Sequence, residues 1–426
     1  MRKIQISLLP RLLLITAIFA LGACSSSSGS GRYASHPWKP QNEETVAQSN
    51  PDALTDAATG NAALPKPDET ASSQSESLPP VKVAILLPLS GQHQKLGQSM
   101  LQAAQLALFD IGFDNFELVP KDTAGTPTGA RAAAQSALQD GAKLILGPLF
   151  AESVRAAKQV TQSANINMVA FSTDWTLANG QTYLISFMPF DQVERVISYA
   201  KQSGLYNIGV LSPSDDYGNG VVSAYRSIAN TIGVQTVNTA RFSPNGQDLF
   251  PAVRSLSESM KSQPLDAILM PVGGAMARQV GTFLTSNDMP PSKVRRLGTG
   301  LMDDAILATD KNLNGLWFAA PDPASRRKFE YRYQSTYGEK PPRIASLAYD
   351  ATALAAVLAR TGLRSTGRPA FGSDSITNPN GFAGVDGIFR FRPDGISERG
   401  LAVMEYKNGR IKVIDPAPTS FRKYTY

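Results

Sequence analysis

From residue 81 onward, short apolar runs alternate with longer stretches in which apolar residues recur at the helical period. The apolar runs are continuous, as in strands buried on both faces of a parallel sheet. They predict strands at 81–87, 116–120, 143–146, 166–171, 207–212, 266–270 and 316–319. The amphipathic stretches predict helices at 97–110, 127–139, 152–163, 192–203, 217–232, 247–261 and 275–286. This alternation indicates a doubly wound α/β fold, with two sheets that meet near residues 188–190 rather than one very large sheet.

The pattern changes near the C-terminus. Asp394-Gly395 and Asn408-Gly409 separate short apolar pieces, and both dipeptides are strong signals for hairpin turns. We therefore predict antiparallel strands at 387–391, 401–406 and 410–414.

The first 23 residues have the layout of a secretory signal peptide: basic residues, an apolar run over 12–21, then small residues. The run is about half the ~20 residues that span a bilayer. Cys24 is the only cysteine, and Leu21-Gly22-Ala23-Cys24 resembles the lipobox of bacterial lipoproteins. That resemblance predicts acylation of Cys24; the alternative is an unpaired cysteine beside an ordinary cleavage site. By analogy with Gram-negative lipoproteins, Ser25 favours an outer-membrane anchor facing the periplasm.

Residues 24–80 contain few large apolar residues, and their charges are three basic against seven acidic side chains. Such a segment buries too little area to offset the entropy of ordering, so we predict a disordered tether behind the acylated N-terminus. The tether either serves only to keep the folded domain away from the lipid, or it allows the domain to contact a partner some distance from the membrane. The folded domain is expected over residues 81–426.

The sequence offers little for catalysis. His36 and His93 are the only histidines, and no nucleophile elbow, phosphate loop or metal-ligand spacing accompanies them. The segment "GNGVVS" at 218–223 is only a partial dinucleotide motif. The formal net charge of +6 is spread over short basic runs without interleaved aromatics, which argues against a nucleic-acid partner. We expect no catalytic residue, no metal and no cofactor.

In open α/β sheets, ligands bind beyond the carboxyl ends of the strands. The loops expected there are residues 88–97, 147–153, 171–176, 212–220, 271–276 and 298–304. At these loops the chain resembles the type 1 periplasmic-binding fold, particularly its leucine/isoleucine/valine-binding branch. The resemblance rests on "VAILLPLSG", "LILGPLFAES", "NMVAFSTD", "DDYGNG" and "FEYRYQSTYGEKPPRIASLAYDA".

This resemblance implies two Rossmann-like lobes joined by a three-strand hinge. Crossovers between the lobes are expected near 186–190, 296–301 and 384–400. The first lobe would comprise about 81–188 plus 300–385, and the second about 189–299 plus 386–426.

The resemblance also implies candidate ligand-binding residues, namely Ser172, Thr173, Asp174, Tyr217, Asp303 and Asp304. Two departures put an ordinary amino-acid pocket in doubt: Phe150-Ala151 replaces the family's serines, and Gly300-Leu301 stands where an acidic residue would meet an ammonium group. Structural roles are open alternatives, since Tyr217 could pack at the hinge and the aspartates could cap helices. Trp175 could pack between the lobes or contact a ligand.

The C-terminal segment "GFAGVDGIFRFRPDGISERGLAVMEYKNGR" is similar to penicillin-binding-protein activator lipoproteins. This likeness implies a non-catalytic regulator that stimulates a peptidoglycan synthase (a class A penicillin-binding protein) by protein–protein contact, which is the leading expectation. The alternative is an amino-acid or other small-molecule receptor of an ABC uptake transporter, whose partners would be a solute and a permease.

Overall fold

The computed structural model describes residues 79–421. The predicted signal peptide, Cys24 and all but the last two residues of the predicted tether lie outside these residues. No helix between residues 79 and 421 has both the length and the apolar character needed to cross a bilayer.

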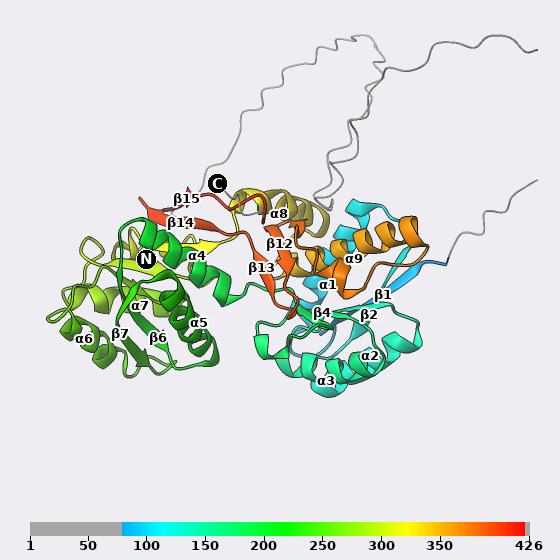
Figure 1. The fold of residues 1–426 in the computed structure, drawn as a ribbon, viewed down its shortest axis with the longest axis horizontal. Coiled ribbons are helices and arrows are strands. Elements are labelled where there is room, and N and C mark those ends of the chain that lie inside the picture. The colour runs from blue at the N-terminus through cyan, green and yellow to red at the C-terminus, as the bar shows by residue number, and fades with distance from the viewer. Residues whose placement is uncertain (1–78, 422–426) are drawn as a thin grey trace, which may run out of the picture. The chain divides into compact units, whose positions relative to one another are not determined.

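The first lobe is built on a five-stranded parallel sheet in the order β2-β1-β3-β4-β5 (Figure 1). Helices α1, α8 and α9 contribute to the core on one face, and α2 and α3 pack on the other. The strands are β1 (Val81–Leu87), β2 (Phe116–Asp122), β3 (Leu144–Leu146), β4 (Met168–Ala170) and β5 (Thr182–Leu184). The helices are α1 (Gln94–Ile111), α2 (Pro127–Gln139), α3 (Ala151–Ser163), η1 (Trp175–Leu177), α8 (Pro323–Tyr337), α9 (Ala345–Thr366) and α10 (Ser373–Ile376).

The second lobe is built on a seven-stranded sheet in the order β15-β14-β10-β9-β8-β6-β7, in which β14 and β15 are antiparallel. Helices α4 and α5 cover one face, and α6 and α7 cover the other. The strands are β6 (Asn207–Pro213), β7 (Gln235–Phe242), β8 (Ala267–Leu269), β9 (Arg295–Gly298), β10 (Trp317–Ala320), β14 (Ala402–Lys407) and β15 (Arg410–Asp415). The helices are α4 (Pro189–Gln202), α5 (Asp216–Ile232), α6 (Leu249–Ser259), α7 (Gly274–Ser286), η2 (Gly300–Met302), η3 (Leu307–Thr309) and η4 (Lys311–Leu313).

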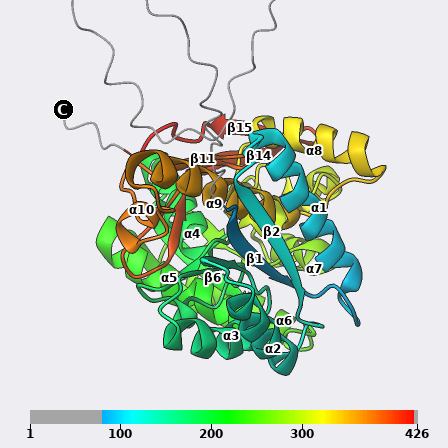
Figure 2. The ribbon, with the colours of Figure 1, turned by 90° about the vertical axis from the view of Figure 1, so that its right-hand side faces the viewer.

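A small antiparallel sheet completes the first lobe (Figure 2). It comprises β11 (Phe382–Gly384), β12 (Gly387–Phe391) and β13 (Ser397–Arg399). Phe389 and Phe391 of β12 are buried in the core that α1 and α9 share. The chain then passes from β13 directly to β14 of the second lobe.

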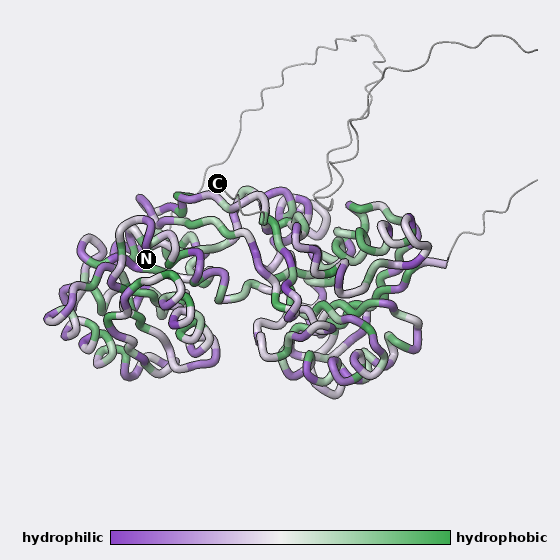
Figure 3. Tube along the Cα trace, viewed as in Figure 1, coloured by the Kyte–Doolittle hydropathy of each residue, from purple (hydrophilic) through white to green (hydrophobic). Residues whose placement is uncertain are grey.

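Burial of apolar surface explains why α9 forms where it does. From Ala345 to Ala359 every side chain of this helix is buried, so the helix is apolar all round rather than on one stripe. Its most extensive packing is against α1, and the hydrophobic positions in Figure 3 gather along the strands and these inner helices. The core of the first lobe therefore depends on segments far apart in the chain.

The predicted doubly wound α/β fold with two sheets is confirmed, and the predicted strand at 81–87 and helix at 127–139 match β1 and α2 residue for residue. The boundary expected at residue 300 differs from the structure, because β10 pairs with β9 in the second lobe. Residues 300–313 form short helices whose Met302, Leu307 and Leu313 pack on the same sheet. This segment therefore also belongs to the second lobe. The second crossover lies between β10 and α8. Residues 386–426 were expected in the second lobe, but the part up to the end of β13 belongs to the first lobe, and β14 and β15, which follow it, belong to the second.

Candidate functional site

The loop after β4 holds three of the six predicted site residues. Ser172 is buried, and its Oγ accepts a hydrogen bond from the Asp174 amide at 3.1 Å. Thr173 is exposed. Asp174 Oδ1 accepts from the amide of Thr176 at 3.1 Å and thereby caps η1. Asp174 Oδ2 lies 3.4 Å from Arg155 Nη2 on α3, so the carboxylate already has a cationic neighbour.

Tyr217 lies in the first turn of α5, a helix that begins where Asp215 Oδ1 accepts from the amide of Gly218. Its phenol donates a hydrogen bond of 2.9 Å to Thr299 Oγ1, which follows β9. Burial raises the pKa of Tyr217 to about 12, so the phenol stays protonated and acts as a donor at neutral pH. The residue therefore joins two loops of the second lobe.

Trp175 brings the two lobes into contact. Its ring meets that of Phe190, the second residue of α4, edge-on with centroids 4.9 Å apart. It also lies directly against Gly220 of α5. Through Trp175 the loop that holds Ser172 and Asp174 lies next to the helix turn that holds Tyr217. The packing role considered for Trp175 is thus observed.

The two remaining predicted residues follow η2 and make different contacts. Asp304 Oδ1 accepts from the amide of Ile306 at 2.8 Å, which is a local turn contact. Asp303 Oδ2 lies 4.0 Å from Nε of Arg343, which precedes α9 in the first lobe. Burial raises the pKa of Asp303 to about 6, although the positive charge of Arg326 opposes the shift. The structure therefore places Asp303 beside these arginines of the first lobe, whereas Asp304 stabilises its own turn.

A buried charge cluster at the hinge was not predicted. Arg399 Nη1 lies 3.4 Å from Asp350 Oδ2, and both side chains are almost fully buried. Arg343 Nη1 lies 3.0 Å from Asp386 Oδ1, and its guanidinium stacks over Phe187. Burial raises the pKa of Asp350 to about 7 and raises that of Asp386 as well.

One signal could have revealed this cluster. Asp350 interrupts the long apolar segment "ASLAYDATALAAV", and a charge in such a run requires a buried partner. Its partner Arg399 lies far along the chain, which sequence alone does not show.

The groups near Trp175 and Asp303 are hydroxyls, a phenol, aromatic rings, arginines and the carboxylates of Asp174 and Asp303. His93 packs its ring against Phe150 with centroids 4.6 Å apart. Over residues 79–421 no group of three or more histidine, cysteine or acidic side chains could hold a metal ion. Arginines are the natural partners of carboxylates.

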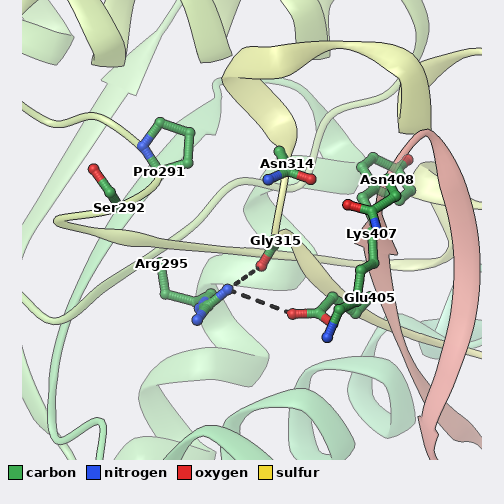
Figure 4. Close-up of a pocket in the computed structure, with 9 residues that line it drawn as sticks. Pro291, Ser292, Arg295, Asn314, Gly315, Glu405, Lys407 and Asn408 are labelled. Carbon is green, nitrogen blue, oxygen red and sulfur yellow. Dashed lines mark hydrogen bonds and ion pairs between the residues drawn. The ribbon is translucent and has the colours of Figure 1, made fainter.

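Two pockets lie elsewhere in the described part of the chain, and neither is lined by a predicted site residue. One, of about 340 Å³, is shown in Figure 4 beside the turn between β14 and β15. Its Arg295 already donates to the carbonyl of Gly315 at 2.6 Å and pairs with Glu405 at 3.7 Å. The other pocket has about 660 Å³ and lies in the first lobe.

Comparison with known proteins identifies the same fold. Residues 80–410 match the sequence model of a family described as periplasmic binding protein. A solved structure described as a putative branched-chain amino acid ABC transporter from Rhodospirillum rubrum has a TM-score of 0.70 at 17% identity, over 79% of this chain and 100% of that chain. A solute binding protein from Rhodopseudomonas palustris, solved with 3,4-dihydroxybenzoic acid, has a TM-score of 0.58 at 18% identity, over 81% and 98%.

A further similarity covers only a part of the chain. The penicillin-binding protein activator LpoA of Pasteurella multocida is 29% identical over 149 residues. The match covers 34% of this chain and 25% of that protein.

Proposed function

This chain belongs to the periplasmic binding protein family, and from that premise we propose that it is a solute receptor of the periplasm rather than an enzyme. The observation that carries the proposal is the contact of Trp175 with Gly220. It joins loops at the carboxyl ends of both sheets, which is where open α/β sheets receive ligands. The proposed partners are a small molecule and the permease of an uptake transporter.

The contacts of the candidate acids support a carboxylate ligand without an ammonium group. Asp174 and Asp303 each have an arginine neighbour, Arg155 and Arg343 respectively. An ammonium group would have to compete with these arginines for the acids. A ligand carboxylate, by contrast, finds guanidinium groups at both places. Phe150 and Leu301, which replace polar residues expected from the resemblance, favour an apolar or aromatic remainder.

The decisive experiment compares benzoate, 3,4-dihydroxybenzoate and leucine as ligands of the purified protein. The two aromatic acids should raise the melting temperature saturably, and leucine should bind at least tenfold more weakly. A ligand at a hundred times its Kd adds about 2.7 kcal/mol to the free energy of unfolding, which a thermal scan resolves readily.

Arg155→Met should weaken the binding of the aromatic acids about tenfold. Arg131→Met is the matched control, because it removes an exposed arginine from the neighbouring helix α2 of the same lobe. Tighter binding of leucine than of the acids would overturn the ligand class. Absence of any shift with all three ligands would count against the receptor function with these solutes.

The partial likeness to LpoA favours a second candidate, the activation of a peptidoglycan synthase by direct contact. Acylation of Cys24 and an outer-membrane anchor belong to this proposal, since a tethered domain could reach a synthase across the periplasm. The test is whether the purified protein raises the glycan-polymerising rate of a class A synthase from the same bacterium. An unchanged rate and no measurable complex would remove this candidate.

A further inference from the structure

The larger of the two pockets, of about 660 Å³, lies where the parallel strands of the first sheet begin. The candidate site lies at the other end, where these strands finish. Lys143 comes directly before β3, Asn167 directly before β4 and Gln181 directly before β5, and all three line the pocket. In a parallel sheet the amino ends of all strands lie on one side and their carboxyl ends on the opposite side. The pocket is therefore separate from the loops that follow these strands.

The other wall of the pocket comes from residues 368–373, which lie between α9 and α10 and include the first residue of α10. Arg368 is exposed on this segment, and Phe371 is 7% exposed and belongs to the core of the first lobe. Asn167 Nδ2 donates to the Phe371 carbonyl at 2.7 Å and ties the two walls together. The pocket thus borders the buried core at Phe371 and has a polar rim.

Three carboxamides in the pocket keep hydrogen-bonding capacity for a ligand. Gln181 Nε2 donates to Asn165 Oδ1 at 2.6 Å, which uses one end of each amide. A carboxamide carries both an acceptor oxygen and two donor hydrogens, so further groups of Asn165, Asn167 and Gln181 are available. Vicinal hydroxyls or peptide groups satisfy such groups well.

The charge of the pocket is positive. Lys143 and Arg368 line it, and neither forms an ion pair within residues 79–421. No acidic side chain is among the lining residues. This differs from the pocket of Figure 4, where Glu405 pairs with Arg295.

We propose that this pocket is a second binding site, which takes a small carboxylate-bearing molecule rich in hydroxyl or amide groups. Most small-molecule pockets are lined predominantly by hydrophobic and aromatic side chains, whereas six of the nine residues that line this pocket are polar or charged, and two of these are cations. Its volume falls within the usual range of about 300–1,000 Å³ for ligand pockets. Acidic sugars and short acidic peptides share the required chemistry, and the experiment separates them.

The test titrates the purified protein with digalacturonic acid and with the dipeptide Glu-Glu by calorimetry. At least one should bind saturably, and the tighter of the two identifies the source of the ligand. The uncharged analogues, galactobiose and Gln-Gln, should bind at least tenfold more weakly because they lack the carboxylates.

The double variant Lys143→Met/Arg368→Met should weaken binding at least tenfold. Both side chains are exposed, so the fold should tolerate the change. Lys261→Met/Lys340→Met is the control, because it removes two exposed cations elsewhere and changes the net charge equally. Absence of binding by both acids, or an equal loss in the control, would overturn the proposal. The variant should leave the binding of aromatic acids unchanged, which separates this site from the proposed receptor site.

Discussion

Trp175 of the first lobe lies so close to Gly220 of the second that a Cβ atom on Gly220 would come within 2.6 Å of the indole Cη2. Real Cβ atoms do not approach other heavy atoms so closely, so one partner would have to move. The lobes therefore touch at this point because residue 220 has no side chain.

Gly220→Ala should lower the free energy of unfolding by about 1–2 kcal/mol, because the overpacked contact costs about 1–3 kcal/mol and the gain in helix propensity offsets part of it. Within a helix the same change ordinarily stabilises by about 0.5–1 kcal/mol. A loss would therefore report the clash rather than helix propensity. Urea unfolding followed by circular dichroism measures the difference.

The control is the same substitution in a Trp175→Ala background. There the clash is absent, and Gly220→Ala should be neutral or stabilising. If alanine destabilises both backgrounds equally, the contact with Trp175 is not the cause.

Tyr217→Phe should lower the free energy of unfolding by about 1 kcal/mol, since it removes the hydrogen bond to the fully buried Thr299. Tyr331→Phe is a suitable comparison, because Tyr331 is 76% exposed and should give no measurable change. Equal effects of the two substitutions would show that the bond to Thr299 contributes nothing. Thermal and urea unfolding both resolve the expected difference.

Asp174→Ala should cost about 1 kcal/mol, because the amide of Thr176 loses its capping acceptor. Asp174→Asn keeps an acceptor oxygen and should cost clearly less. The pair therefore separates capping from charge. If asparagine were as harmful as alanine, the ion pair with Arg155 would matter more than the cap.

Asp191 should make stability depend on pH. Burial raises its pKa from 3.8 to about 7, against the hydrogen bond from the Arg399 amide and the charge of Arg399, while Glu398 and Glu194 add to the rise. Between these pKa values the folded state holds a proton that the unfolded state has released. The free energy of unfolding therefore falls as pH rises from about 4 to 7.

In Asp191→Asn the free energy of unfolding should fall less steeply with pH, by up to the contribution of one bound proton. At pH 8 this variant should be more stable than the parent protein. The measurement is urea unfolding at pH 5, 6, 7 and 8. Asp216→Asn, an exposed acid in the first turn of α5, should leave the slope unchanged. An unchanged slope in Asp191→Asn would contradict the assignment.

The parts of the fold that followed from sequence are those with a clear burial pattern. Strand β1 is almost fully buried, and its sequence is apolar at every position except Lys82. Strand β7, "QTVNTARF", was missed because six of its eight residues keep some exposure and its composition is polar. Strand β5 has three residues, too few for any period, and α9 is apolar all round and lacks an amphipathic stripe.

The candidate site was predictable only as a set of loops. The rule that ligands bind beyond strand ends selects only loops, and Ser172, Asp174 and Tyr217 were named from the family resemblance. The structure places their loops next to each other through Trp175. Whether an aspartate binds a ligand or caps a helix is decided by local geometry, and the residue type is the same in both cases. The pocket at Asn167 and Phe371 joins positions more than two hundred residues apart, which no local pattern can reveal.

The packing of α9 against α1 also constrains how the protein can be made. A chain that emerges N-terminus first exposes the inner face of α1, including Met100 and Ala103, until α9 follows. One face of the first sheet, which α1 covers only in part, must therefore wait for α8 and α9 while β6 to β10 of the second sheet are synthesised. A fragment that ends before residue 345 would expose this apolar surface permanently and aggregate, rather than fold as half of the protein.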